Sequence, residues 1–448
     1  MTIPLTSATQ MGAALRDRQT TSERLTHDAV KHIREMDHEL GAFVLLDNHG
    51  AHDAATVADR DFAAGIDHSP LQGIPVAVKD LFDMAGLPTT CGSASSFGTA
   101  RADIDAEVIG DLRRSGAVIV GKTVLHEFAF GATGDRSAHG PSRNPHDRLR
   151  VSGGSSGGSA VAVASGMVPL SLGTDTAGSV RVPAALCGVV GFKPAFDVIS
   201  VKGVHPLAPS LDHVGLFGAS LADTKPLYEI LSSTTMKDTA PLSRIGWIEP
   251  DAIAPTDTEI TAAVRDALRR AGIGVAAATS TVSGYDPGEL FSIFTALQAR
   301  EAYDVHRDHL DADEHLIDPG VFARLRVGQT VTDSAFADAQ RARRGFRAVV
   351  DAALDEYGVL ALPSTPITAP LLHQTTTEIG GKTVDTRAAL LSLTSPWNLT
   401  GSPAISIPGG HLHGLPFGIQ LIASPGQEAL LFATAAQIER TPPESKGN

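Results

Sequence analysis

One stretch of very small residues constrains this sequence more than any other. Residues 153–159 read Gly-Gly-Ser-Ser-Gly-Gly-Ser, so no side chain in the stretch is larger than a hydroxymethyl group. Such a backbone turns sharply, reaches positive φ values and exposes N–H groups at the start of the next element. A flexible linker has a similar composition, but here Val151 precedes the stretch and the small apolar residues 160–167 follow it. We therefore predict a structured turn that leads into a buried helix.

Helices and strands are predicted to alternate along the chain, and a second polar turn, residues 173–179, follows the strand that comes after this helix. Hydrophobic periodicity favours two helices within residues 5–36, and residues 201–216 read as a loop. The other predicted helices are 51–64, 106–115, 160–167, 221–231, 256–271 with Thr256 as cap, 290–310, 334–357 and 427–439; the predicted strands are 73–78, 117–120, 168–172, 359–363, 403–408 and 418–422. This alternation favours an α/β fold in layers.

Composition narrows the class of protein. The 448 residues are 42% hydrophobic and 19% charged, with a formal net charge of −14. This charge argues against a nucleic-acid partner or attraction to a membrane surface. No apolar run approaches the length of a membrane span, and residues 1–11 lack the pattern of a secretory leader, so we expect a cytoplasmic protein. Cys91 and Cys187 are too few for a disulfide framework or a zinc site, and the 17 histidines form no metal-binding motif.

A lysine stands at the end of the apolar strand predicted for residues 73–78. Burial there would disfavour the charged form of Lys79 and lower its pKa. The alternative is that Lys79 and Asp80 form a charged pair that reaches the surface. On this segment alone the two interpretations stay open.

Two short motifs give competing hypotheses. Residues 116–123 match the phosphate-binding pattern G-x-x-x-x-G-K-[ST], but the four intervening residues are Ala-Val-Ile-Val, which read as a buried strand and not as an exposed cradle. We therefore regard the match as coincidental. Residues 153–157 also satisfy G-x-S-x-G, which would make Ser155 a nucleophile with a histidine downstream. The candidate histidines are His205, His213 and His306, and nothing in the sequence singles one out. The serines at 156 and 159 are interpreted as helix-capping and packing residues.

A longer pattern decides between these hypotheses. Residues 151–166 and 172–188 together resemble the hallmark of the amidase signature family, and coincidence is negligible over this length. Supporting matches are Pro75-Val-Ala-Val-Lys-Asp80, Gly121-Lys-Thr123 with Glu127, Asn144-Pro145, Gly191-Phe-Lys-Pro194, Ser210-Leu-Asp212, Asn398, Gly401-Ser-Pro-Ala404 and Leu415-Pro-Phe-Gly-Ile-Gln420.

The resemblance implies a single compact α/β domain over residues 1–448, with a mixed twisted central sheet covered by helices on both faces. Residues 67–225 would form the catalytic core, residues 226–357 a variable region that shapes the substrate pocket, and residues 358–440 the part that completes the sheet. No metal or organic cofactor is implied.

Carried over by position, the family's catalytic triad falls on Lys79 as base, Ser155 as bridging serine after a cis peptide bond from Gly154, and Ser179 as nucleophile. The chemistry agrees, because a serine hydroxyl needs a nearby base and a lysine serves as one only when its pKa is depressed. The N–H groups of Thr176, Ala177 and Gly178 are predicted to form an oxyanion hole. Asp175 and Arg181 are expected to brace the turn, and Gly153 with Gly154 to give it room.

The resemblance predicts hydrolysis of a small-molecule carboxamide through an acyl-Ser179 intermediate, with a homodimer as an open option. Phe130, Gly131, Ala132 and Phe294 are predicted to line a partly apolar pocket. An allophanate hydrolase-like urea derivative is disfavoured, because the carboxylate-binding Tyr and Arg of that enzyme's relatives fall on Phe294 and Ala302.

A second alternative is the glutaminase component of a glutamyl-tRNA amidotransferase, its A subunit, which the chain resembles at residues 186–188 and 210–212. Against this alternative, Ala195-Phe196-Asp197 replaces the usual Thr-x-Gly-Arg. From another functional class, a nucleotide-binding protein built on residues 116–123 stays as the outside alternative.

Overall fold

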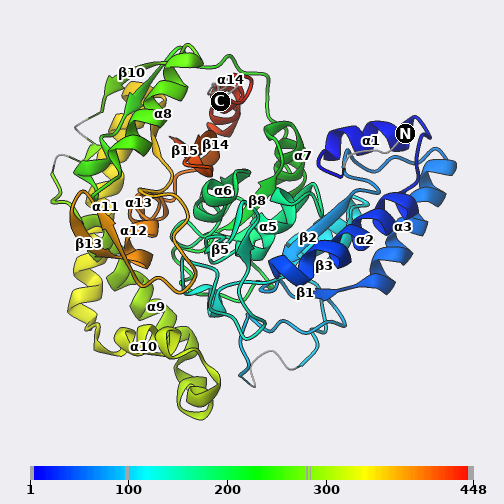
Figure 1. Ribbon diagram of the computed structural model, residues 1–448, viewed down its shortest axis with the longest axis horizontal. Helices are drawn as coiled ribbons and strands as arrows, with labels where there is room; N and C mark the ends of the chain where they lie inside the picture. Colours follow the sequence, from blue (N-terminus) through cyan, green and yellow to red (C-terminus); the bar gives the residue numbers. More distant parts are fainter. Residues whose placement is uncertain (1–4, 96–99, 279–280, 283, 442–448) are drawn as a thin grey trace.

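The chain is organised around one mixed sheet of 11 strands, shown in the computed structural model of Figure 1. The structure describes residues 5–95, 100–278, 281–282 and 284–441, so residues 1–4 of the segment inspected for a leader lie outside it. In spatial order the strands are β1 (Phe43–Leu46), β3 (Val118–Thr123), β2 (Pro75–Lys79), β6 (Leu170–Thr174), β8 (Val214–Gly218), β7 (Val190–Lys193), β14 (Ala404–Leu412), β15 (Leu415–Ala423), β11 (Val359–Pro363), β9 (Arg244–Trp247) and β10 (Gly274–Ala277).

Two small hairpin sheets accompany the large one: β4 (Arg143–Asn144) with β5 (Asp147–Val151), and β12 (Thr376–Ile379) with β13 (Lys382–Asp385). The helices are α1 (Ala8–Arg16), α2 (Ser22–Leu40), α3 (Asn48–Ala63), α4 (Glu107–Arg114), α5 (Gly157–Ala164), α6 (Arg181–Cys187), α7 (Leu221–Ser232), α8 (Thr258–Arg270), α9 (Glu289–Asp313), α10 (Pro319–Val327), α11 (Asp333–Tyr357), α12 (Thr386–Ser392), α13 (Pro396–Thr400) and α14 (Glu428–Glu439). Short 3₁₀ helices include η1 (Glu127–Ala129), η2 (Pro250–Ala252), η4 (Glu314–Leu316) and η5 (Gly328–Thr330).

The sheet is buried on both faces because apolar residues fill both sets of alternating strand positions. In β11, Val359 and Ala361 pack into one hydrophobic cluster, whereas Leu360 and Leu362 pack into another. Successive side chains of a strand point to opposite faces, so each face has its own core. Helices α4, α7, α8 and α14 contribute to the first core, and α9, α11, α12 and α13 contribute to the second. This is the predicted α/β architecture.

Most predicted elements are present, and the errors have identifiable causes. Residues 201–216 were expected to be a loop, but β8 begins at Val214 and lies in the middle of the sheet. Two glycines in its five residues dilute the strand signal. The cap of α8 is Asp257 and not Thr256, since the Asp257 side chain accepts a hydrogen bond from the N–H of Glu259. Among the described helices, none combines the length and apolar character needed to cross a bilayer.

The topology brings two important strand ends together. Strand β2 pairs in parallel with both β3 and β6, so the carboxyl ends of the three strands meet at one edge of the sheet. Lys79 is the last residue of β2, and Thr174 is the last residue of β6. Parallel α/β sheets carry their sites at this kind of edge.

Candidate active site

Lys79 is completely buried at the carboxyl edge of the sheet. Its Nζ lies 2.7 Å from Ser155 Oγ and 2.7 Å from Thr174 Oγ1. Burial lowers the pKa of Lys79 to about 7, although the carboxylates of Asp175 and Asp212 oppose the shift. A lysine side chain with this pKa is an uncharged amine in a large fraction of molecules near pH 7. Lys79 therefore has both the position and the proton affinity of a base.

The surface pair of Lys79 with Asp80 does not form. Asp80 instead binds Lys122, whose Nζ lies 2.6 Å from Asp80 Oδ1, and both side chains are almost fully buried. Lys122 belongs to the buried strand β3, as do the other residues from 118 to 123. The phosphate-cradle hypothesis for this segment is therefore wrong, because its lysine is already occupied inside the sheet.

Ser155 lies at the start of the turn into α5. The peptide bond between Gly154 and Ser155 is cis, and Gly153 has a φ of +83°. Side chains are excluded here, because a Cβ on Gly154 would lie 2.7 Å from the backbone nitrogen of Gly134. The hydroxyl of Ser155 contacts Lys79 and not a histidine ring. The geometry therefore does not favour the G-x-S-x-G hypothesis.

The two serines interpreted as caps have another role. Ser156 precedes α5, but its hydroxyl donates to the carbonyl of Thr174 and accepts from the N–H of the same residue. Ser159 Oγ donates to the carbonyl of Leu172. Neither hydroxyl caps α5, so the capping half of the interpretation was wrong, but both serines are buried and pack α5 against strand β6. They fix Ser155 relative to the end of β6.

The guanidinium group of Arg181, whose N–H donors all have acceptors, holds the turn that carries Ser179. Arg181 Nη2 and Nε lie 2.9 and 3.0 Å from the two carboxylate oxygens of Asp175, and neither side chain is exposed. The remaining Arg181 donors go to the Asn398 and Gln420 side chains and the carbonyl of Thr394. Burial alone would raise the pKa of Asp175, but the charge of Arg181 outweighs it and holds this pKa below its usual range. Asp175 and Arg181 thus lie where bracing residues were expected.

Ser179 lies beside the turn of Ser155. Its carbonyl accepts the N–H of Ser156 at 3.2 Å, and only 3% of the residue is exposed. Within the described residues its hydroxyl has no hydrogen-bond partner. The hydroxyl is therefore free to meet a substrate.

The backbone donors near Ser179 differ in availability. The N–H of Gly178, predicted as an oxyanion donor, instead donates to Asp175 Oδ1 at 2.8 Å. The N–H groups of Thr176, Ala177 and Ser179 have no acceptor in the part of the chain that the structure describes. A side chain at Gly178 is excluded, since its φ is +131° and a Cβ would lie 2.1 Å from Thr394 Oγ1. The backbone conformation at Gly178 directs its own N–H to Asp175. The N–H groups of Thr176, Ala177 and Ser179 stay available for a ligand.

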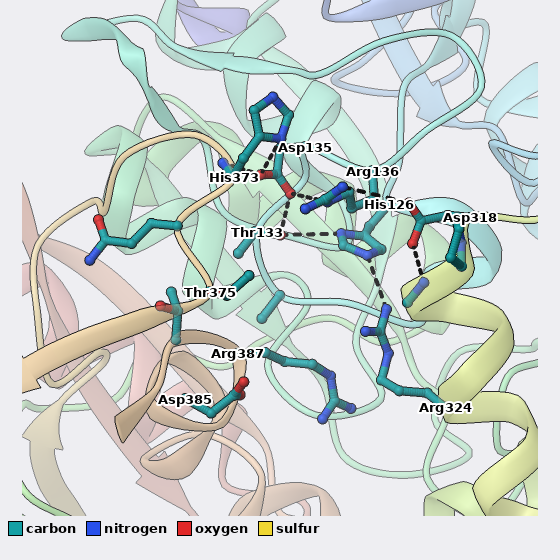
Figure 2. Close-up of a pocket in the computed structure, with 15 residues that line it drawn as sticks. His126, Thr133, Asp135, Arg136, Asp318, Arg324, His373, Thr375, Asp385 and Arg387 are labelled. Atoms are coloured by element: carbon teal, nitrogen blue, oxygen red, sulfur yellow. Dashed lines mark hydrogen bonds and ion pairs between the residues drawn. The ribbon is translucent and has the colours of Figure 1, made fainter. Parts of the chain in front are cut away.

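A pocket of about 500 Å³ is lined by residues from segments 126–136, 318–324 and 373–387 (Figure 2). Its wall is linked to the turn by His126, whose backbone N–H donates to the carbonyl of Ser155 at 3.0 Å. Ala132, one of the predicted pocket residues, lines it. The other lining residues are largely polar: His126, Thr133, Asp135, Arg136, Asp318, Pro319, Gly320, Arg324, His373, Gln374, Thr375, Asp385, Thr386 and Arg387.

Three of the predicted pocket residues, Phe130, Gly131 and Phe294, do not line this cavity. Phe294 is completely buried in a hydrophobic cluster, where it packs near the ring of Phe291. Phe130 is also buried, and its ring lies beneath the guanidinium groups of Arg324 and Arg387. Gly131 makes room for the His126 ring, because a Cβ there would lie 2.0 Å from His126 Nε2. Arginines, and not phenylalanines, face the cavity.

Sequence reasoning missed His126, Arg324 and Arg387. His126 lies within the segment 121–127 that supported the resemblance, so its neighbours carried a usable signal. The two arginines lie on helices α10 and α12, where a lone arginine reads as part of a solvated face. Figure 2 shows both arginines at the same cavity, and their guanidinium carbons lie 5.6 and 5.4 Å from the centre of the Phe130 ring.

Comparison with known proteins decides the family. The family model Amidase matches residues 24–432. The chain belongs to the amidase signature family. It is 34% identical to the AtzE component of 1-carboxybiuret hydrolase from Pseudomonas sp. (strain ADP), over 94% of this chain and 96% of the relative. It is equally identical to the A component of glutamyl-tRNA(Gln) amidotransferase from Anaeromyxobacter sp. (strain K), over 96% and 95%.

Solved structures agree with this assignment. An amidase crystal structure superposes with a TM-score of 0.89 at 31% identity, covering 96% of this chain and 98% of that one. The 6-aminohexanoate cyclic dimer hydrolase, solved with its substrate, gives a TM-score of 0.86 at 25% identity and covers 98% of each chain. The chain is thus an amidase-family hydrolase with the predicted fold.

Proposed function

We propose that this amidase-family hydrolase cleaves a small-molecule carboxamide to a carboxylic acid and ammonia or an amine, through an ester formed on Ser179. One observation carries the proposal: a buried lysine with a pKa of about 7 contacts Ser155 Oγ at 2.7 Å, beside the turn that presents Ser179. A lysine buried without a carboxylate partner is costly. Its retention at this edge is explained if its neutral amine works as a base.

In the first half of the reaction, Ser179 Oγ attacks the amide carbon while its proton passes to Ser155, and the proton of Ser155 passes to Lys79 Nζ. The N–H groups of Thr176, Ala177 and Ser179 are the donors that we assign to the oxyanion. A preorganised donor of this kind contributes about 3 to 4 kcal/mol to transition-state stabilisation. The C–N bond then breaks, and the amine leaves with the proton returned through Ser155.

In the second half, water attacks the Ser179 ester, and Lys79 accepts a proton from the water through Ser155. The acid leaves and Ser179 regains its proton. Thr174 Oγ1, 2.7 Å from Lys79 Nζ, accepts an N–H of the neutral amine and so directs the nitrogen lone pair toward Ser155.

Labelling with a fluorophosphonate followed by peptide mass spectrometry tests the assignment. We expect the probe on Ser179, no labelling of Ser179→Ala, and retained folding of that variant by circular dichroism. Labelling of Ser155 in the wild type, or undiminished amide turnover by Ser179→Ala, would contradict the proposal.

A second candidate is the glutaminase component of an amidotransferase, favoured by the match over 96% of the chain to such a component. The two candidates differ in their need for a partner. The hydrolase releases ammonia from simple amides when purified alone, whereas a component of this type would release it from glutamine only with its partner present. A continuous ammonia assay on the isolated chain separates them.

A further inference from the structure

A second cavity, of about 240 Å³, lies at the carboxyl edge of the sheet. It is lined by Thr174, the last residue of β6, and by Thr176 in the turn that carries Ser179. Leu81, just beyond the end of β2, also lines it. The cavity therefore borders the two strand ends that hold Lys79 and its neighbours.

The walls of this second cavity are mainly apolar. Thr176 Oγ1 donates to Asp212 Oδ1 at 2.6 Å, and the other oxygen of Asp212 accepts two backbone N–H groups. Lys202, also in the lining, lies 2.9 Å from a carboxylate oxygen of Glu107. These polar groups are therefore engaged within the protein. The apolar residues of the lining include Leu81, Ala129, Val201, Val204, Leu207 and Pro209.

Two histidine rings in the lining are uncharged at neutral pH. Burial lowers the pKa of His205 to about 4 and holds the pKa of His213 well below its usual range. A charged group would lose its hydration against such walls without gaining a partner, whereas an apolar group would gain by leaving water. An apolar cavity of about 150 Å³ takes up benzene. A four-carbon chain or a single ring therefore fits this cavity.

The position of the cavity relates it to one half of the substrate. Thr174 Oγ1 and Ser155 Oγ each lie 2.7 Å from Lys79 Nζ, so one wall residue of the cavity contacts the base that returns a proton to the departing nitrogen. Thr176, another wall residue, supplies an N–H group that we assign to the oxyanion. A group that enters the cavity therefore extends from the reacting carbon on the side of the amine.

We propose that this cavity is a subsite for the leaving group, and that it selects secondary amides whose amine carries an apolar group of about four to seven carbons, from butyl to benzyl. When the C–N bond of the tetrahedral intermediate breaks, the nitrogen takes the proton that Ser155 relays from Lys79, and a primary amine is released. This inference rests on the proposed amidase function and names the amine that the reaction releases.

The test uses the N-methyl, N-ethyl, N-propyl and N-butyl amides of one acid, the acid whose primary amide the wild type hydrolyses fastest. The four amines have nearly the same basicity, so differences in kcat/KM report burial of the alkyl chain. Each added methylene should raise kcat/KM about fourfold when it is fully buried. We expect the N-butyl amide to exceed the N-methyl amide by about 20-fold or more.

Val204→Phe fills the cavity from its half-buried wall. It should lower kcat/KM for the N-butyl amide by about tenfold or more, and for the N-methyl amide by less than about threefold. Val198→Phe is the matched control, because Val198 is 37% exposed in the same segment and does not line the cavity. Val201→Trp, at a wall residue that is 41% exposed, obstructs the cavity without changing the core and should act like Val204→Phe.

Calorimetric binding to Ser179→Ala gives a readout that does not depend on turnover. The N-butyl amide should bind this variant about tenfold more tightly than the N-methyl amide, and Val201→Trp in the same background should remove the difference. Equal binding, hydrolysis of primary amides alone, or an equal loss on both amides in Val201→Trp would overturn the subsite. The amidase proposal would survive these results if Ser179 is labelled, and failure of that labelling would overturn it separately.

Discussion

The turn that carries Ser179 and the pocket beyond Ser155 each hold an arginine, and the two arginines are satisfied very differently. All five N–H donors of Arg181 have protein acceptors, including both carboxylate oxygens of Asp175. Arg387 reaches one neutral acceptor and lies near another arginine. A saturated guanidinium fixes the shape of a turn, whereas an unsaturated one retains donors for a ligand.

A similar contrast separates two buried lysines of the sheet, Lys122 and Lys79. Lys122 is neutralised by Asp80 at 2.6 Å inside β3, and it stabilises the fold. Lys79 has two hydroxyl neighbours and no carboxylate in contact. Its charge is destabilised, which is what a base at neutral pH requires. Of Lys79 and Lys122, the lysine that lacks a counter-ion in contact is the one to which we assign chemistry.

The largest expected effect separates chemistry from recognition. Lys79→Met should lower kcat by about 10³-fold to 10⁴-fold, because it removes the base that takes the Ser179 proton. The loss should be the same for every amide that the wild type hydrolyses, because the base serves the chemical step and not recognition. Steady-state kinetics on two different amides measure it. Lys225→Met, at a half-buried site on α7 that the mechanism does not use, is the control and should retain activity. A substrate-dependent loss in Lys79→Met would break the comparison.

The second effect concerns stability. Arg181→Met should lower the free energy of unfolding by about 3 to 5 kcal/mol, since Asp175 would stay buried without its counter-ion. Arg387→Met should be neutral or slightly stabilising, because it removes a desolvated cation that has no carboxylate in contact among the described residues. Urea denaturation followed by fluorescence compares the two variants. Similar destabilisation in both would show that the two arginines are equally structural.

The pH dependence gives the third effect. Lys79 acts in its neutral form, and the neutral fraction rises with pH, so kcat/KM should rise tenfold per pH unit below about 7 and level off above it. The negative charge of Asp212 favours the protonated form of Lys79 and so opposes the lowering of its pKa by burial. Asp212→Asn should therefore move the inflection to lower pH. A profile that is measured with a neutral amide and is flat from pH 5.5 to 8 would contradict the role of Lys79.

The smallest effect tests the orientation of the base. Thr174→Val removes the hydroxyl that lies 2.7 Å from Lys79 Nζ but keeps the shape of the side chain. We expect kcat to fall about fivefold to tenfold, as for the loss of one hydrogen bond of about 1 kcal/mol, with KM unchanged. Thr174→Ser should restore most of the rate. An effect on KM alone would place Thr174 in substrate binding instead.

Much of the site was predictable because its residues lie in local patterns. The Gly/Ser turn and the apolar strand that ends at Lys79 stand out as short segments, and the sequence resemblance placed Ser155 and Ser179 within a continuous stretch. Strand β8 escaped notice because its glycines hide the strand signal. The role of Gly178 was misjudged because nothing in the sequence shows that Asp175 folds back onto its N–H.

By itself the sequence determined the α/β class, the family and the order of the motifs, because hydrophobic periodicity and small-residue turns are local properties of the chain. Only the tertiary structure decided which charges are compensated. Arg324 and Arg387 are 63 residues apart and lie on different helices, and both converge on Phe130. Whether a buried charge has a partner depends on distances of a few ångströms between segments remote in sequence, and electrostatic energy in a desolvated pocket depends steeply on those distances.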